Sequence, residues 1–242
     1  MNKKTLAALA LSTALFTNIY GSSCQINSGA YVGLSAGMAH LAGKMDTSTG
    51  IQIGAPLGAY SNNAPAGLSQ TSAAGSIFAG YGMNLNNFWV AAELYYQFDQ
   101  LNYKKELTLT GHPITFSVKV KSGGAWGGNA HLGYVFNKNC ILYAIIGAEA
   151  RRFKLSFVNT DIINFTAQSF DKSYTSVAFA PGLGVRISVG KNWAVRTEYK
   201  CALHRNKNVS GSGANPGGGD DQADIKLKPQ VHSINVGLIY SF

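Results

Sequence analysis

Charge is scarce in this sequence. Lys, Arg, Asp and Glu make up 13% of its residues, whereas about 25% is usual for a soluble domain. Long apolar runs are missing as well, since no segment offers the roughly 20 unbroken apolar residues that a membrane-spanning helix needs. The three cysteines are too few for a disulfide framework. These shortages argue against an ordinary soluble domain, a helical membrane protein and a disulfide-stabilised secreted fold.

Glycine and aromatic residues are abundant instead. The chain has 28 Gly, 12 Tyr and 12 Phe, and 46% of its residues are hydrophobic. Its mean hydropathy is nevertheless close to zero, at +0.02. Transmembrane β-barrels have this composition, because polar residues alternate with apolar ones along each strand.

The first residues follow the order of a secretory signal. Lys3 and Lys4 precede an apolar run over residues 6–16, and small residues follow at 21–23. We predict a signal peptide over residues 1–23 and an outer-membrane β-barrel domain over residues 24–242. Cys24 leaves two alternatives open, since it is either lipidated after cleavage or merely lies beside the cut.

Apolar and polar residues alternate with a period of two in eight segments, which is typical of strands. In the last segment Ile234, Val236 and Leu238 share one face, while Ser233 and Asn235 share the other. The predicted strands are residues 29–41, 72–83, 88–98, 114–136, 141–153, 176–189, 193–203 and 232–242.

Eight is an even number, as a closed antiparallel bacterial barrel requires. Lipid cannot satisfy a free strand edge, so the last strand must pair with the first. The sequence therefore predicts an all-β fold, a closed antiparallel eight-stranded transmembrane β-barrel. In its fourth strand we expect one parity throughout, with Val118 and Val120 outside and Lys119 and Lys121 inside.

Short and long connections alternate along the chain. Short turns on the periplasmic side and long outer loops are the expected asymmetry, which places both termini in the periplasm. The short turns are residues 84–87, 137–140 and 190–192, and the long connections are residues 42–71, 99–113, 156–172 and 204–228. Beside the short turns we expect an aromatic girdle of Phe88, Trp89, Phe136, Trp193, Tyr240 and Phe242.

The signal sequence, alternating strands, short turns and terminal aromatics resemble the small outer-membrane barrels of Gram-negative bacteria. These are the outer-membrane protein A barrel type and the surface-antigen barrels of intracellular bacteria. The resemblance implies location in the bacterial outer membrane, with extracellular loops and a structural or surface-interaction role. It also implies that Tyr240 and Phe242 form the signal that the barrel-assembly machinery reads. Outer-membrane lipid, lipopolysaccharide, that machinery and host surface molecules are the implied partners.

Charged side chains gather on the inward parity. A barrel of eight strands has room only for its own side chains, and an unpaired buried charge is costly. Opposite charges lie at similar depths when counted from the short turns, so we expect a structural network that fills the lumen. Its predicted members are Glu93, His131, Glu149, Arg151, Arg186, Arg196 and Glu198, with Lys200 on the same parity.

Two other functions are weighed against this one. The inward charges could line a narrow porin for ions or small solutes, and this alternative stays open. A lipid-modifying enzyme would need His, Ser and an acid at the outer rim, where His204 and His232 are the candidates. Since neighbouring residues on a strand point to opposite faces, Ser233 does not meet His232, and we predict no enzymatic activity.

The sequence contains no motif for a cofactor or a metal ion. Residues 211–224 lack the alternating aspartates and closing Glu of a calcium loop, and we predict a mobile surface loop there. Cys140 and Cys201 are expected too far apart to form a disulfide.

The formal net charge of +9 suits an anionic membrane surface. We predict that basic residues at the loop ends contact lipopolysaccharide phosphates, although simple solvation would account for them equally well. These residues are Lys104, Lys105, Arg205 and Lys207. No compact basic module exists, so nucleic acid is not an expected partner.

Overall fold

The computed structural model describes residues 28–52, 59–108, 114–137, 139–161, 167–214 and 220–242. The predicted signal peptide and Cys24 lie outside these ranges. Among the described residues, no helix is long and apolar enough to cross a membrane. They form ten strands in one antiparallel sheet. The strands are β1 (Gly29–Gln52), β2 (Ala59–Leu85), β3 (Phe88–Asp99), β4 (Leu101–Thr108), β5 (Ile114–Asn137), β6 (Cys140–Asp161), β7 (Ala167–Ser188), β8 (Trp193–His204), β9 (Lys207–Ala214) and β10 (Asp220–Ser241).

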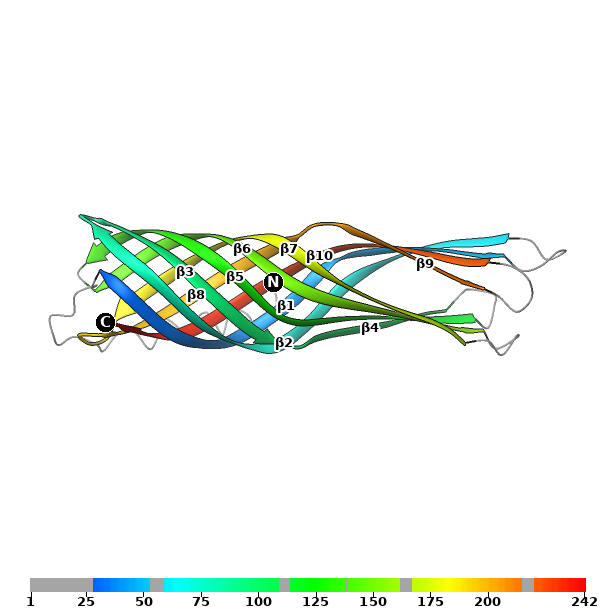
Figure 1. The fold of residues 1–242 in the computed structure, drawn as a ribbon, viewed down its shortest axis with the longest axis horizontal. Coiled ribbons are helices and arrows are strands. Elements are labelled where there is room, and N and C mark those ends of the chain that lie inside the picture. Colours follow the sequence, from blue (N-terminus) through cyan, green and yellow to red (C-terminus); the bar gives the residue numbers. More distant parts are fainter. Residues whose placement is uncertain (1–27, 53–58, 109–113, 138, 162–166, 215–219) are drawn as a thin grey trace, which may run out of the picture.

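Eight of these strands close into a ring (Figure 1). Their order is β1-β2-β3-β5-β6-β7-β8-β10, and β10 pairs with β1 from Ser241 opposite Tyr31 to Gln222 opposite Gly50. β4 follows β3 after a break at Gln100, and β9 follows β8 after a break at Arg205 and Asn206. The predicted closed eight-stranded barrel is confirmed.

The carboxyl terminus lies at the end of the barrel that carries the short turns (Figure 1). The backbone N–H of Ser241 donates to the carbonyl of Asn192 at 2.8 Å, and that of Phe242 donates to Ala30 at 3.1 Å. Between β2 and β3 the turn contains Asn86 at φ 57°, a left-handed conformation that Asn tolerates better than most residues. The hydrogen bonds of Ser241 and Phe242 attach the end of the chain to the turn before β8 and to β1.

The outer wall carries a band of exposed apolar side chains that alternate with buried ones. Leu94 is the most exposed of them, at 74%. A soluble protein would not expose a band of this size, whereas hydrocarbon would cover it. Its large members include Val32, Leu34, Met38, Ile77, Met83, Leu94, Trp126, Leu132, Ile146, Phe179, Leu183, Leu203, Val236 and Leu238.

Aromatic rings pack edge to face beside the short turns. Trp193 and Tyr240 have ring centroids 5.0 Å apart, and Tyr240 and Phe242 follow at 5.3 Å. Phe88 and Phe136 also lie on the outer wall and are exposed. Trp89 was wrongly predicted for this girdle. It is 2% exposed and points into the lumen, because odd-numbered residues of β3 face inward.

The prediction of one parity along the fourth strand is wrong. β5 contains a bulge, where Ser122 pairs with Phe153 but Ala125 pairs with Arg151, so β5 has one residue more than β6. An extra residue moves all later side chains to the other face. Val118 and Val120 are therefore buried, while Lys121 is exposed and Lys119 is half-buried.

The predicted long connections are mostly strand. β1, β2, β5, β6, β7 and β10 continue well past the apolar band, and β4 and β9 add two shorter strands there. Residues 211–214 and 220–224 of the predicted mobile loop belong to β9 and β10, and residues 215–219 lie outside the described ranges. We call this part of the molecule the outer extension; the described side chains in it are residues 44–46, 67–70, 101–106, 117–122, 151–156, 171–176, 207–210 and 224–230.

In the outer extension the barrel divides into two sheets. One has the order β2-β1-β10-β9, and the other has the order β4-β5-β6-β7. Figure 1 shows them as two diverging groups of ribbons, one with β9 and one with β4. No ladder joins β2 to β4 or β7 to β9 in the described residues. The hydroxyl of Tyr103 on β4 crosses the first gap and donates to the carbonyl of Gly67 on β2 at 2.8 Å.

An apolar core lies between the two sheets. Its side chains come from both sheets, and most are almost fully buried. In this region apolar residues point inward and most charged ones point outward, which is the reverse of the barrel wall below; Arg151 at its base and Lys105 and Lys207 on its edge strands are exceptions. The core contains Leu41, Met45, Leu68, Leu101, Tyr103, Val118, Val120, Phe153, Leu155, Val209, Ile225, Leu227 and Val231.

Candidate functional site: the filled lumen

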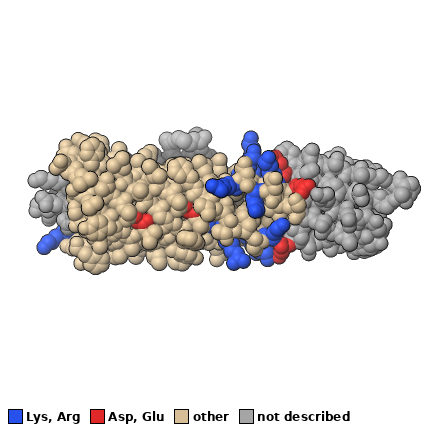
Figure 2. Space-filling model, turned by 45° about the horizontal axis from the view of Figure 1, so that its top comes forward, with Lys and Arg blue, Asp and Glu red and all other residues tan. Residues whose placement is uncertain are grey.

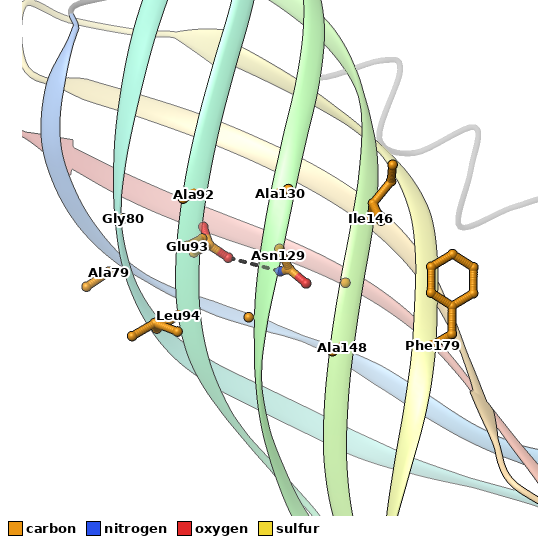
Figure 3. Close-up of a pocket in the computed structure, with 12 residues that line it drawn as sticks. Ala79, Gly80, Ala92, Glu93, Leu94, Asn129, Ala130, Ile146, Ala148 and Phe179 are labelled. Atoms are coloured by element: carbon orange, nitrogen blue, oxygen red, sulfur yellow. Dashed lines mark hydrogen bonds between the residues drawn. The ribbon is translucent and has the colours of Figure 1, made fainter.

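Glu93 on β3 is the centre of the inner ionic cluster. Arg196 on β8 donates to both of its carboxylate oxygens, with Nη2 3.2 Å from Oε1 and Nη1 bonded to Oε2. The same Nη1 lies 3.3 Å from Oε1 of Glu198. Tyr31 and Asn129 donate to Glu93 as well, each at 3.3 Å, and Figure 3 shows the bond from Asn129. Glu93 is thus satisfied by a cation and two neutral donors.

Arg151 on β6 organises a second cluster, nearer the outer extension. Its Nη1 lies 2.6 Å from Oδ1 of Asp99, and its Nε lies 3.0 Å from Oε1 of Glu149. His204 places Nε2 3.9 Å from the same Glu149 oxygen. Gln97 donates to Asp99 at 2.7 Å. Asp99 is not among the predicted members of the network, although it shares the inward parity of Gln97 and could have been found on that basis.

Tyrosine hydroxyls complete the two other glutamates. Tyr95 donates to Glu149 at 2.9 Å, and Tyr143 donates to Glu198 at 2.8 Å. A hydrogen bond to an ionised acceptor is stronger than one between neutral groups, so these hydroxyls help to hold the carboxylates in the lumen. These tyrosines are also absent from the predicted network, because only charged residues on the inward parity were expected in it.

Glycine makes room for the lumen rings on neighbouring strands. A Cβ atom on Gly184 would lie 2.5 Å from Cζ of Tyr143, and one on Gly33 would lie 2.2 Å from Cζ of Phe78. Side chains at these two positions would displace the rings. The two glycines therefore act in packing, because each allows an aromatic ring to lie flat across the next strand.

Arg186 departs from the expected pairing with a carboxylate. It is buried, but its guanidinium carbon lies 5.4 Å from the ring centroid of Tyr31 and 5.6 Å from that of Trp89. Its Nη2 donates to Oγ of Ser241 at 3.0 Å. Arg196 is its direct neighbour across the β7–β8 ladder. Since Arg196 binds the carboxylates, Arg186 contacts aromatic faces instead, and such faces attract cations.

His131 and Lys200 also contact aromatic rings. The His131 ring stacks on Trp89 at 5.7 Å and lies 5.1 Å from Tyr143. Both of its ring nitrogens are buried without a hydrogen-bond partner in the described residues. The Nζ atom of Lys200 lies 3.5 Å from the ring centroid of Tyr95. All seven predicted lumen residues are buried, but only five of them, Glu93, Glu149, Arg151, Arg196 and Glu198, form the close ion pairs of the two clusters.

The lumen contents therefore change along the barrel axis. Arg186, Trp89 and Tyr31 lie nearest the short turns, and the Glu93 and Arg151 clusters follow. Phe153 comes two residues after Arg151 on β6 and belongs to the apolar core of the outer extension. Its ring lies edge to face with His204 at 5.0 Å. Beyond Arg186 and its aromatic neighbours, the interior thus contains paired charges and, further from the short turns, apolar side chains.

A shallow hollow in the outer wall faces away from this lumen (Figure 3). Small residues of β2, β3, β5 and β6 form its floor, and Leu94, Ile146 and Phe179 stand around it. The hollow belongs to the apolar band, where membrane hydrocarbon would fill it. Its floor includes Ala79, Ala92, Ala130 and Ala148.

Basic residues gather in a band at the base of the outer extension, directly beyond a wall on which little charge is visible (Figure 2). Lys104 forms an ion pair with Glu106 at 2.7 Å, and Lys154 forms one with Asp171 at 2.7 Å. The hydrogen bond from Lys104 lowers the pKa of Glu106, and the hydrogen bond from Lys154 lowers the pKa of Asp171. Both acids are therefore ionised at neutral pH.

The predicted lipopolysaccharide contacts occupy two kinds of position. Lys104 is exposed on the outer face of β4, and Arg205 is exposed at the break between β8 and β9. Lys105 and Lys207 instead lie on the core-facing parity of β4 and β9, whose free edges border the gaps between the sheets. Inward-facing lysines on edge strands are a common protection against unwanted strand pairing. These four residues thus lie on strands or at a strand break, and not at the ends of long loops.

The candidate residues for enzymatic chemistry are separated. Ser233 is buried in the lumen, whereas His232 is on the outer wall. His204, expected at the rim, is buried beside Glu149 and Phe153. Cys140 and Cys201 are free thiols. Within the described ranges, no group of three or more His, Cys, Asp or Glu could hold a metal ion.

A closed ring with an apolar outer band and a polar filled interior defines a transmembrane β-barrel. Residues 5–242 match the family described as "Outer membrane protein beta-barrel domain". The chain belongs to this family of bacterial outer-membrane proteins.

Solved structures with the same fold have very different sequences. The outer membrane protein OprG from Pseudomonas aeruginosa is 14% identical, with a TM-score of 0.53, over 92% of this chain and 100% of that one. The outer membrane protease OmpT from Escherichia coli is 11% identical, with a TM-score of 0.50, over 91% and 100%. Neisserial surface protein A is 15% identical, with a TM-score of 0.43, over 89% and 98%. No curated protein sequence matches the chain. At these identities OprG and OmpT share only the fold with this protein.

Proposed function

We propose that this protein is a closed surface barrel that presents its outer extension to partners outside the cell and does not conduct solutes. The single observation that carries the proposal is the occupied interior. Two ionic clusters fill the lumen, and the apolar core of the outer extension lies directly beyond them. A water column would have to displace both.

The proposed orientation rests on the short turns. The short turns and the carboxyl terminus face the periplasm, because an exported barrel is inserted from that side and keeps its short turns there. Residues 1–23 direct the export. Tyr240 and Phe242, which lie together on the outer wall at the periplasmic end, form the signal for the barrel-assembly machinery.

The outer extension would thus begin at the level of the lipid headgroups. Above the apolar band, the first charged outward residue is basic on several strands, for example Lys44 on β1, Arg152 on β6 and Lys228 on β10. Asp46 lies one outward position further on β1, and Asp224 lies two further on β10. A basic lower tier fits the phosphates of lipopolysaccharide, and Lys104 and Arg205 belong to it. Host surface molecules would contact the extension beyond this tier.

No enzymatic role is proposed. The acids of the two clusters are held by arginine and tyrosine inside the barrel, and the outward His232 has no acid among its described contacts. Incubation of the refolded protein with phospholipid and lipid A tests this directly. Turnover by the wild-type protein would replace the surface-interaction role with an enzymatic one.

Liposome swelling tests the closed lumen. Refolded mature protein in proteoliposomes should give no more swelling in small sugars than protein-free liposomes, while an open porin tested alongside swells. Rapid swelling of the wild-type proteoliposomes would favour the narrow porin and contradict the proposal.

A further inference from the structure

A row of polar side chains crosses the outer wall where the first and last strands of the ring meet. His40 on β1 lies directly opposite His232 on β10. Thr71 on β2 is the neighbour of His40 on one side, and Cys201 on β8 is the neighbour of His232 on the other. Both histidines are half-buried.

A hydroxyl group holds the Nδ1 atom of each ring. Nδ1 of His40 lies 2.8 Å from Oγ1 of Thr71, and Nδ1 of His232 lies 2.7 Å from the hydroxyl oxygen of Tyr199. Tyr199 also stacks on the His232 ring, with centroids 6.1 Å apart. When Nδ1 carries the proton and donates it to the hydroxyl oxygen, Nε2 has a free lone pair. No partner of either Nε2 occurs among the described contacts.

We propose that His40 and His232 bind a divalent transition-metal ion through their Nε2 atoms. Metal-binding histidines almost always have the other ring nitrogen held by a hydrogen bond, which fixes the tautomer and the ring direction. Here both rings have that second partner. Their centroids are 6.5 Å apart, whereas two imidazoles at about 2.0–2.1 Å from one tetrahedral ion bring their centroids to roughly 5 Å. Both half-buried rings must therefore turn toward each other when they bind the ion.

The ligand set selects the kind of ion. Imidazole nitrogens suit Zn²⁺, Cu²⁺ and Ni²⁺, whereas Mg²⁺ and Ca²⁺ prefer oxygen. Two histidines leave coordination positions open for water or phosphate. Phosphate oxygens would be near, because Lys44 and Lys228 of the basic tier lie two outward positions further along the same strands, beyond Ala42 and Gln230. The ion would thus bind at the boundary between the apolar band and the headgroups.

Metal binding here would stabilise the pairing of β1 with β10, which closes the barrel. The two ligands belong to β1 and β10, the strands that seal the ring. An ion that binds only the folded state stabilises it by mass action, and at 100 times the dissociation constant it raises the folded-to-unfolded ratio about 100-fold. The proposal does not depend on whether the lumen conducts.

The test is Zn²⁺ titration of refolded, tag-free mature protein in detergent, followed by calorimetry. We expect one ion per chain and at least a tenfold loss of affinity in His40→Gln and in His232→Gln. His131→Gln is the matched control, since His131 is buried in the lumen and not on the outer wall, and this variant should bind as the wild type does. Tyr199→Phe, which removes only the hydroxyl at Nδ1, should lower the affinity about tenfold.

A spectroscopic readout separates the pair from other sites. Cu²⁺ bound to the wild-type protein should show electron paramagnetic resonance couplings to two imidazole nitrogens, and each single variant should lose one. Each variant must keep heat-modifiable gel migration, which reports an intact barrel. Equal Zn²⁺ affinity in the wild type and both histidine variants, or weak binding without saturation, would overturn the proposal.

Discussion

At the scale of single residues, the barrel interior depends on contacts between residues distant in the sequence. Arg196 and Glu93 are 103 positions apart and bind each other through two hydrogen bonds. Both side chains are almost fully buried. Removing one partner leaves the other as an uncompensated charge, which costs more than the pair contributes.

Arg196→Ala should therefore destabilise the refolded barrel strongly. Loss of one partner of a buried ion pair costs about 3–5 kcal/mol when the site is dry, and water in the lumen would reduce that cost. Urea titration of the protein in lipid vesicles measures it. Arg152→Ala, which removes an exposed arginine from the outer face of β6, should change stability by only about 0.5 kcal/mol.

The double variant Arg196→Ala/Glu93→Gln refines this prediction. Since both changes affect one contact, their costs should not add, and the coupling should reach about 0.5–3 kcal/mol. Additive costs would mean that Arg196 and Glu93 do not stabilise each other.

Gly184 provides a second prediction at this scale. A methyl group there would collide with the Tyr143 ring and displace its hydroxyl from Glu198. Gly184→Ala should cost about 1–3 kcal/mol, as overpacking usually does. Gly67→Ala is the control, because a Cβ at that position meets no atom within 4 Å. Equal stability of the two variants would show that the ring can move without cost.

At the scale of strands, much of the fold could be predicted and part of it could not. Period-two alternation predicted all eight ring strands, because lipid on one side and a polar lumen on the other keep the pattern clear. It failed at the β5 bulge, because Val118 and Trp126 are both apolar and the change of parity between them is hidden. Gly123 and Gly124 lie in the bulge, and glycines inside a strand pattern are a signal that could have indicated it. The alternation also failed in the outer extension. There the core is apolar and the outside is polar, which is the reverse of the barrel wall. The polar and charged outward residues of the extension therefore resemble those of a surface loop.

The lumen site was only partly predictable for a similar reason. Parity placed the charged residues inside, but a strand pattern contains no information about which charge meets which. Arg186 shows this limit, because its position predicted an ion pair and its neighbours provided aromatic faces instead. Only the register of β7 against β8 reveals that Arg196 competes for the same acids.

The terminal strand gives a prediction for assembly. Deletion of Phe242, or Phe242→Asp, should lower the amount of protein in the outer membrane, because the exposed ring at the end of β10 is the proposed assembly signal. Immunoblots of outer-membrane fractions measure this. Phe88→Asp changes a similarly exposed ring at the same end and should have a smaller effect. Wild-type levels of the Phe242-deleted protein would contradict the prediction.

The two sheets of the outer extension should depend on their apolar core. Phe153 is fully buried there, and Phe→Ala changes in a core cost about 3–5 kcal/mol. Phe153→Ala should therefore increase amide hydrogen exchange and protease cleavage in the extension, while the barrel keeps its heat-modifiable migration. Lys154→Ala, at the next and outward-facing position, should leave both unchanged. Equal exchange in the two variants would mean that the core does not hold the sheets together.

At the scale of the whole molecule, the protein has a lipid-facing barrel and an outer extension whose interiors differ. The barrel interior is ionic and aromatic, and the extension interior is apolar. In the described residues no polar path runs on from the barrel interior through the extension, because Phe153 and Leu155 follow Arg151 directly on the inward face of β6. We therefore propose that function lies on the outside of the extension and at its basic lower tier, with the barrel as the anchor.

Single-channel recording of the refolded mature protein in planar bilayers tests whether the lumen is closed. We expect the protein to insert, as checked by heat-modifiable migration of protein recovered from the same vesicles, and to give no conductance steps over a wide voltage range. Stable, ion-selective steps in the wild type, with a selectivity that changes in Arg196→Ala while stability does not, would contradict the closed lumen and establish a narrow pore.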